Sequence, residues 1–420
     1  MTNPTSPSVP SASAPGKARD TRIDVLRALA LLTIFVNHVP GNVYEFLTHK
    51  NFGFSDAAEA FVLISGIAAG MAYGRKFVPG ARILTALKTW RRAGVLYITH
   101  IMTTVATLAI FSAGALHFGA PELLEKINIA PLMEDTARAL AGLATLGHQL
   151  GYNNILSMYA GVLLMLPAFL LVGRYSLGLM VGLSGAVWLA SGLFGIAPPA
   201  YPNEGVWFLN PLSWQFLFVI GVACSIHARR AGGLRLHPWL VGAALAYAVL
   251  ALLWVRVPLW GIDTSLGLPR VLTGFDKTYL SLPRLLHVLA VATLIVSIPA
   301  LSNLFRTSGD HPLAVLGKHS LPIFVAGTLL AMLGQVMQFV NPAGGLAFDT
   351  VLIATGIALQ FALAYWLEWL PTIGWGGKAA SQRQPAPAGT KPHMAPTLAP
   401  PTGRSYAKTT LAVAGSGETA

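Results

Sequence analysis

Residues 22–42, RIDVLRALALLTIFVNHVPGN, form one apolar segment that also carries ionisable residues. Arg27 and His38 are eleven positions apart. At about 100° per residue this spacing brings both side chains to one helix face, roughly 16 Å apart along the axis. Asp24 lies one turn before Arg27, so an acid and a base meet near the helix start.

Ionisable residues inside a bilayer cost roughly 2.5–3.5 kcal/mol or more, and they therefore mark functional sites by default. The occurrence of Arg27 and His38 on one face of an apolar helix favours a function for this pair. The alternative is that Arg27 reaches to the membrane interface and that His38 serves only as a hydrogen-bonding residue.

The composition indicates a membrane protein. The chain has 420 residues, of which 54% are hydrophobic and 10% charged, and its mean hydropathy is +0.60. Soluble domains carry about 25% charged residues. We therefore expect an all-α, polytopic integral membrane protein. The single cysteine, Cys224, excludes an intramolecular disulfide, and no metal site is expected. The net charge of +12 resides in short loops and tails, which argues against a nucleic-acid partner.

Hydropathy and length predict about ten transmembrane helices. We place them near residues 23–41, 57–74, 93–116, 153–173, 176–196, 211–227, 238–258, 279–301, 312–340 and 350–371. Basic residues concentrate in the 75–92 loop and in the tails, so both termini are expected to be cytoplasmic. Residues 1–21 and 372–420 are expected to be disordered cytoplasmic tails, the first of them not a cleaved signal peptide, around a membrane domain at 22–371.

The helical rise sorts the polar residues of the spans into two layers. We expect an outer layer that contains His38, Asp56, Glu59, Arg284 and His287, and a purely basic inner layer that contains Arg27, Arg91, Arg92 and Lys318. In the outer layer, His38 and Arg284 come out at the same depth, and Asp56 and Glu59 open the second span as an i,i+3 pair.

The two layers suit a group transfer across the membrane. Arginines of an inner layer bind the phosphates of a cytoplasmic donor, although the same residues could serve only to set the topology. An outer histidine accepts a proton from an acceptor hydroxyl, and a nearby cation such as Arg284 stabilises the oxyanion of an attacked carbonyl.

Two further patterns bear on the acceptor and on the packing. Aromatic and amide residues in the outer loops at 197–210 and 259–278 suit a carbohydrate, with an ordinary interfacial aromatic belt as the alternative. Glycines at positions 66, 70 and 74 of the second span, in SGIAAGMAYG, predict close helix packing.

Several segments carry a resemblance to a known family. Arg27 and His38 resemble the RX10H motif of membrane acyltransferase-3 proteins, and FVLISG (61–66) and WRRAGVLY (90–97) resemble further motifs of that superfamily. More specifically, the chain resembles the OpgC branch, as seen in FVNHVPGNVYEFLTHKNFGFSDAAEAFVLISG (35–66), NNILSMYAGVLLMLP (153–167) and LPRLLHVLAV (282–291). The resemblance covers roughly residues 22–371.

The resemblance implies a membrane-bound O-acyltransferase with ten spans in the bacterial inner membrane. It would move succinyl groups from cytoplasmic succinyl-CoA, a substrate and not a resident cofactor, to hydroxyls of osmoregulated periplasmic glucans. By this resemblance, His38 and Arg27 correspond to the Arg–His pair of the RX10H motif, and Arg91 or Arg92 corresponds to the arginine of the family's third helix. Asp24 and Asp56 match acidic positions of the same motifs. Together with the layers, this predicts catalysis by His38, Asp24, Asp56 and Arg284, and substrate binding by Arg27, Arg91, Arg92, Glu59, His287 and Lys318.

Two alternatives remain open from the sequence. The first is acetyl transfer to another exported polysaccharide, because membrane acyltransferases of this type differ in donor and acceptor. The second is a transporter or flippase that moves a glycan or an anion without chemistry, using the same charges near the midplane. The expected partners of the enzyme are acyl-CoA, a periplasmic glucan and the lipid bilayer.

Overall fold

The computed structural model describes residues 20–373 apart from 235, 258, 260–261 and 263–264. Within those residues the chain is α-helical and contains no β-strand; an isolated bridge joins Pro199 to Val206. The expected all-α class is therefore confirmed. The expected tails lie outside the described residues, except for residues 20–21 and 372–373.

Among the residues described, seven helices are long and apolar enough to cross a membrane. They are α3 (Arg82–Phe118), α6 (Asn154–Tyr175), α7 (Leu177–Phe194), α8 (Pro211–Arg230), α9 (Pro238–Arg256), α14 (Ser320–Val340) and α15 (Gly345–Trp369). The helices α2 (Ala57–Tyr73) and α11 (Leu282–Ser297) are apolar but shorter, and α1 spans Arg22–Asn37. A multi-pass membrane protein is confirmed, while the count of ten spans and the cytoplasmic termini stay predictions.

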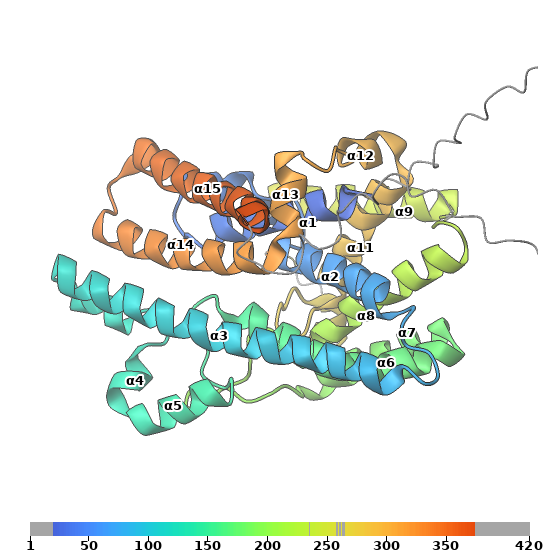
Figure 1. Cartoon of the computed structure of the whole chain (residues 1–420), viewed down its shortest axis with the longest axis horizontal. Coiled ribbons are helices and arrows are strands. Elements are labelled where there is room, and N and C mark those ends of the chain that lie inside the picture. The colour runs from blue at the N-terminus through green and yellow to red at the C-terminus, as the bar shows by residue number, and fades with distance from the viewer. Residues whose placement is uncertain (1–19, 235, 258, 260–261, 263–264, 374–420) are drawn as a thin grey trace, which may run out of the picture. The chain divides into compact units, whose positions relative to one another are not determined.

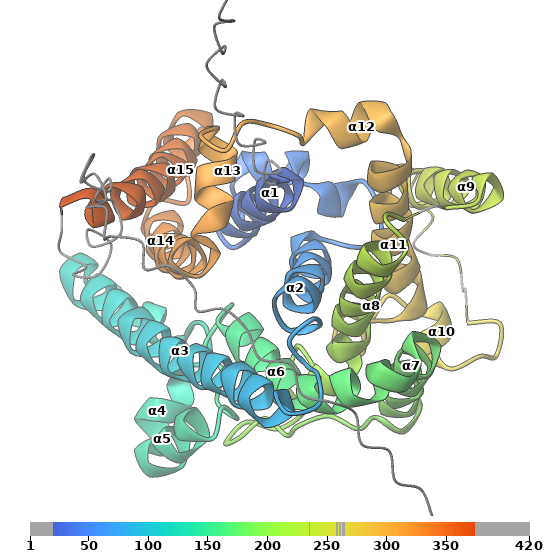
Figure 2. The same ribbon diagram turned by 45° about the vertical axis from the view of Figure 1, so that its right-hand side comes forward.

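Short helices occupy the connections between the long ones. They are η1 (Val43–Leu47), η2 (His49–Asn51), η3 (Pro121–Glu125), α4 (Ala130–Glu134), α5 (Thr136–Ala144), α10 (Arg270–Thr273), α12 (Pro299–Leu304), α13 (Pro312–Lys318) and η4 (Leu370–Ile373). The long helix α3 packs against α6 and α14 (Figure 1). Figure 2 shows α1 and α2 in the interior of the helical assembly, with α13 and α14 beside α1 and α8 beside α2.

The small residues of α2 permit a close contact with α8. A Cβ atom built on Gly66 would lie 2.1 Å from the backbone carbonyl of Phe218, and one on Gly70 would lie 2.0 Å from Ser225 Oγ. The approach is reciprocal, because a Cβ on Gly221 of α8 would lie 2.5 Å from the Leu63 carbonyl. The close packing predicted from the glycine spacing is confirmed.

We expect Gly66→Ala to lower the free energy of unfolding by about 1–3 kcal/mol, because the added methyl group must push the two backbones apart. Gly94→Ala is the matched control, since no atom lies within 4 Å of a Cβ built at that exposed helical position. Thermal unfolding of both variants in detergent measures the difference. Equal midpoints for the two variants would contradict the close contact.

The helices differ from the predicted spans in two places, and both places hold polar residues. The helix α1 ends at Asn37, so that His38 follows the helix as its C-cap and does not lie inside it. The expected span at 312–340 is broken at His319 into α13 and α14. The last turn of α13 packs directly on α1, because a Cβ on Gly317 would lie 1.8 Å from the Asp24 carbonyl.

The loop between α1 and α2 is tied back onto the end of α1. The buried amide of Asn42 donates hydrogen bonds to the carbonyls of Val36 and Val39, at 2.9 and 2.6 Å. The Val36 carbonyl belongs to the last turn of α1, where the i+4 hydrogen bonds of the helix stop, so the Asn42 side chain helps to cap the helix end. The loop then returns through η1 and η2 to the start of α2, which brings residues 45–56 back beside His38.

Candidate functional site

His38 is held in place by its backbone and by its ring. The side-chain amide of Gln335 on α14 donates to the His38 carbonyl at 2.7 Å. The imidazole stacks on the Tyr152 ring with centroids 4.3 Å apart and planes 14° apart. Among the residues that the structure describes, its buried Nδ1 atom has no hydrogen-bond partner. An imidazole oriented in this way suits a general base.

A cavity of about 170 Å³ contains His38. It is lined by Ile34, Asn37, His38, Glu45, Lys50, Asp56, Ala57, Ala58, Tyr152, Asn154, Ile155, Phe208, Leu209 and Lys277. Sequence analysis placed His38 and Asp56 in one outer layer, and the structure brings them to this one cavity. Lys50 forms an ion pair with Glu45. The lining therefore includes one histidine, two acids and two lysines, besides Asn37, Asn154 and Tyr152.

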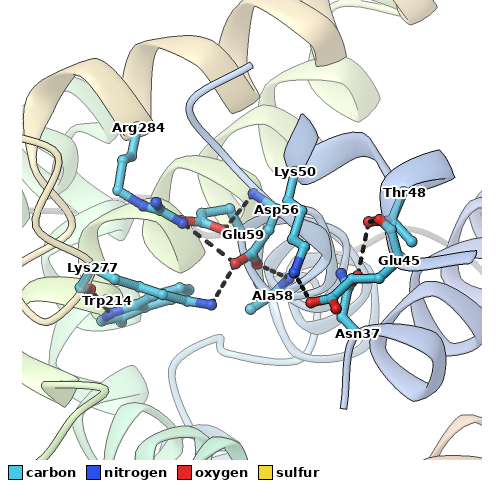
Figure 3. Close-up of polar contacts among 10 residues, drawn as sticks. All are labelled: Asn37, Glu45, Thr48, Lys50, Asp56, Ala58, Glu59, Trp214, Lys277 and Arg284. Carbon is cyan, nitrogen blue, oxygen red and sulfur yellow. Dashed lines mark hydrogen bonds and ion pairs between the residues drawn. The ribbon is translucent and has the colours of Figure 1, made fainter. Parts of the chain in front are cut away.

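An ion cluster lies behind this cavity (Figure 3). Asp56 Oδ2 contacts Lys277 Nζ at 2.5 Å and Arg284 Nη2 at 3.4 Å. Glu59 Oε1 accepts from Arg284 Nε at 2.7 Å, and it lies 2.6 Å from Nη2. The cluster therefore holds two acids and two cations, and Asp56 joins the His38 cavity to Arg284.

The start of α2 builds this cluster from a local signal. Asp56 accepts from the Ala58 N–H at 2.8 Å, and Glu59 accepts from the Asp56 N–H at 3.0 Å, which is a capping box. Burial would raise the pKa of Asp56, but Lys277 and Arg284 outweigh it and hold that pKa well below its ordinary range. Asp56 is therefore ionised. Glu59 is fully buried and bound by Arg284 and by the Asp56 N–H, and its predicted contact with substrate stays a prediction.

His287 lies on the other side of the α2 N-terminus. Its Nδ1 atom is 2.7 Å from Ser55 Oγ, and it lines an apolar cavity of about 610 Å³ that His38 does not line. The single outer layer expected from depth is therefore divided into two sites. The reason is the direction of the side chains: His287 points toward Ser55, while Arg284 one turn earlier points toward Glu59.

The other polar end of α1 holds Arg27. Its Nη1 atom lies 3.4 Å from Asp24 Oδ1 and 3.4 Å from the Gly317 carbonyl. Arg27 is therefore held by an acid of its own helix and by a carbonyl of α13. Its predicted grouping with Arg92 of α3 in an inner layer stays a prediction.

Three predicted residues have surroundings that the sequence did not indicate. Arg91 is exposed. Lys318 forms an ion pair with Glu368 of α15, and Arg27 forms one with Asp24. The inner layer therefore contains acids and is not purely basic. Asp24 lies fourteen positions before His38 on α1, roughly 20 Å along the axis, and so does not share its cavity. The sequence motif grouped Asp24 with His38, but helix length separates them.

Buried apolar residues fill α1 between its two polar ends. Leu31 and Ile34 belong to the main core together with Ile155 of α6. The polar residues around Arg27 and those around His38 thus form separate regions at the two ends of one helix.

A second, larger groove adjoins the His38 cavity. Its volume is about 580 Å³, and it shares Tyr152, Asn154 and Phe208 with the smaller cavity. Amide and aromatic side chains dominate its lining: Asn128, Gln149, Asn154, Asn203, Gln335, Tyr152, Trp207 and Phe208. One acid, Glu204, also lines it. Residues of the 197–210 loop therefore line a groove beside His38. The sequence predicted only that this loop lies at the outer rim.

Sequence analysis missed Lys277, Lys50 and Tyr152. Lys277 pairs with Asp56 across 221 positions, and no local spacing indicates such a contact. Tyr152 directly precedes the NNILSMY segment, so the family resemblance in that segment was the available signal. Among the residues described, no group of three or more His, Cys, Asp or Glu side chains could hold a metal ion.

Comparison with known proteins identifies a family. A family model described as OpgC protein matches residues 19–372, which is most of the chain. No curated protein and no solved structure matches the chain.

Proposed function

The chain belongs to the OpgC family, and on that premise we propose that it transfers succinyl groups from cytoplasmic succinyl-CoA to hydroxyls of osmoregulated periplasmic glucans. Membership of the family points to glucan modification by an acyltransferase-type enzyme. The observation that carries the proposal is the position of His38, which Tyr152 and Gln335 orient in the wall of a cavity that Asp56 and Lys277 also line.

The acceptor half of the reaction uses His38 and Lys277. A glucan hydroxyl in the cavity gives its proton to the imidazole as its oxygen attacks the acyl carbonyl carbon. Negative charge then develops on the carbonyl oxygen, and Lys277 is the cation of the ion cluster that lines the cavity. Arg284 instead contacts Asp56 and Glu59, so we assign it the positioning of Asp56.

The larger groove provides the acceptor site. Sugars offer apolar ring faces and many hydroxyl groups, which suit the aromatic and amide side chains that line this groove. The groove opens beside Tyr152 and Phe208, which also line the His38 cavity. A glucan bound in it would present one hydroxyl to His38 while the rest of the chain stays in the groove.

The donor half uses the other end of α1. Arg27 and Arg92 supply guanidinium groups for the phosphates of a CoA donor, since arginine binds phosphate bidentately. Lys318, which is 45% exposed, and Arg91, which is exposed, lie at the surface and suit more distant phosphate contacts.

We expect Arg27→Gln to raise the KM for acyl-CoA, because it removes a charged phosphate partner. Arg27→Lys keeps the charge but loses the fork of donors, so it should recover only part of the activity. Transfer rates at varied donor concentration measure both effects, with Arg138→Gln in an exposed ion pair as the control. Identical KM values for all four proteins would make Arg27 a helix-packing residue.

Mass analysis of periplasmic glucans from cells with and without this chain tests the proposed function directly. Succinylated glucans should appear only with the chain. The appearance of an acetylated polysaccharide would instead indicate that the donor carries an acetyl group. Glucans that change location but carry no acyl group would indicate a transporter and would overturn the enzyme assignment.

A further inference from the structure

Ser55 and His287 form a hydrogen-bonded pair that the reaction above does not use. Ser55 Oγ lies 2.7 Å from His287 Nδ1, and the Ser55 backbone N–H donates to the same nitrogen at 3.2 Å. Because a backbone N–H only donates, Nδ1 must be an acceptor, and the neutral ring carries its proton on Nε2. The lone pair of Nδ1 therefore faces the serine hydroxyl, as it does in a serine nucleophile paired with its base.

The ring has little freedom to turn away. His287 is 5% exposed and Ser55 is 3% exposed. A Cβ atom on Gly53 would lie 2.0 Å from His287 Nε2, so the glycine is what allows the ring to occupy this place. The Phe54 ring contacts the imidazole edge-on, with centroids 6.0 Å apart. The pair is thus held rigidly, as an activated nucleophile requires.

Ser55 lies between two cavities. It lines the apolar cavity of about 610 Å³ together with His287, and this cavity extends along α1 and α11 to Leu26 and Phe305. The next residue, Asp56, lines the polar cavity that contains His38. Two consecutive residues therefore line two different cavities: the apolar cavity, which reaches Leu26 next to Arg27, and the polar cavity, which contains His38.

We infer that Ser55 is a nucleophile that carries the acyl group as an ester, with His287 as its base. The inference rests on the proposed function and divides that reaction into two halves. In the first half Ser55 Oγ bonds to the carbonyl carbon of an acyl thioester, and the carbon–sulfur bond breaks. The serine proton passes to His287 Nδ1 and then to the departing sulfur, which leaves as a thiol.

The second half of the reaction takes place in the polar cavity. An acceptor hydroxyl attacks the Ser55 ester, the bond between the acyl carbon and Ser55 Oγ breaks, and the acyl group moves to the acceptor oxygen. His38 takes the proton of the acceptor hydroxyl, and this same proton then passes to the departing Ser55 Oγ, so the charge balances and the serine is restored. The apolar walls around Ser55 exclude water, which protects the ester from hydrolysis between the two halves.

Rapid-quench labelling of the purified full chain tests this inference. The protein is mixed with radiolabelled succinyl-CoA in the absence of glucan, quenched, digested and analysed by mass spectrometry. We expect up to one acyl group per chain, on the peptide that contains Ser55. Ser55→Ala should carry no label, and His287→Gln should form it about 10²–10⁴-fold more slowly.

Two further variants keep the test independent of folding. Ser55→Cys should carry the label as a thioester that neutral hydroxylamine removes. Ser297→Ala, on the same helix as His287 and with a hydroxyl that has no partner among the described residues, should label like wild type. His38→Ala should still form the ester but should not pass it on, because His38 acts only in the second half.

The outcomes separate the two proposals. Wild-type protein that succinylates glucan without label on Ser55, or Ser55→Ala that transfers at the wild-type rate, would overturn the serine assignment and leave the proposed function standing. Label on Ser55 with glucans that stay unmodified would support the serine and overturn the glucan acceptor.

Discussion

Replacing His38 with alanine is expected to reduce glucan acylation by about 10²–10⁴-fold, because the acceptor hydroxyl loses its general base. The variant should fold normally, since His38 lies after the last residue of α1 and is held through its backbone carbonyl by Gln335. The acyl content of purified glucans and the membrane level of the protein measure the two effects separately.

His227→Ala is the matched control for this experiment, because His227 is an exposed histidine in the last turn of α8. It should leave acylation unchanged. A second variant, Tyr152→Leu, removes the ring on which His38 stacks and should give a smaller loss than His38→Ala. Near-normal acyl content in His38→Ala would remove His38 from the catalytic machinery.

Replacing Arg284 with methionine is expected to lower the free energy of unfolding by about 3–5 kcal/mol, because it leaves a buried carboxylate without its cation. Glu59 has no exposed surface, and Arg284 is its partner at both 2.6 and 2.7 Å. Asp56 keeps Lys277 in this variant, so the loss should come mainly from Glu59. Denaturation in detergent at matched protein concentration measures the effect.

The double variant Arg284→Met with Glu59→Gln provides the control. Removing both charges together should restore most of the stability, since a neutral side chain at position 59 no longer needs a cation. It should not restore all of the activity, because Asp56 has lost one of the two cations that position it. A double variant no more stable than Arg284→Met would show that packing, and not charge, carries the contribution of Arg284.

The sequence predicted those features that depend on neighbours along the chain. Hydropathy predicted an all-α membrane protein, because each span must bury its own backbone hydrogen bonds. The glycine spacing predicted the close contact of α2 with α8, and the i,i+3 relation of Asp56 and Glu59 is also the spacing of the observed capping box. The motif residues identified the OpgC family over almost the same range that the family model matches.

The calculated depth of a residue in the membrane did not predict which cavity its side chain lines. The calculated depths placed Arg284 and His287 in one layer with His38, yet the structure joins only Arg284 to the His38 cavity, through Asp56. His287 turns to Ser55 and to a different cavity. The depth of a residue in the membrane follows from the helical rise per residue. The direction of its side chain depends on how the helix is rotated against its neighbours. That rotation results from packing and could not be read from hydropathy and spacing.

The sequence by itself determined the membrane class, the all-α fold and the family, and it placed Arg27 and His38 toward the two ends of one helix. Only the tertiary structure decided which side chains meet in a cavity. Lys277 reaches Asp56 across 221 positions, and Tyr152 stacks on His38 from a separate loop. The physical reason is that helices form from hydrogen bonds between close neighbours, whereas a site forms from contacts between distant segments, and loop positions and helix rotations set those contacts.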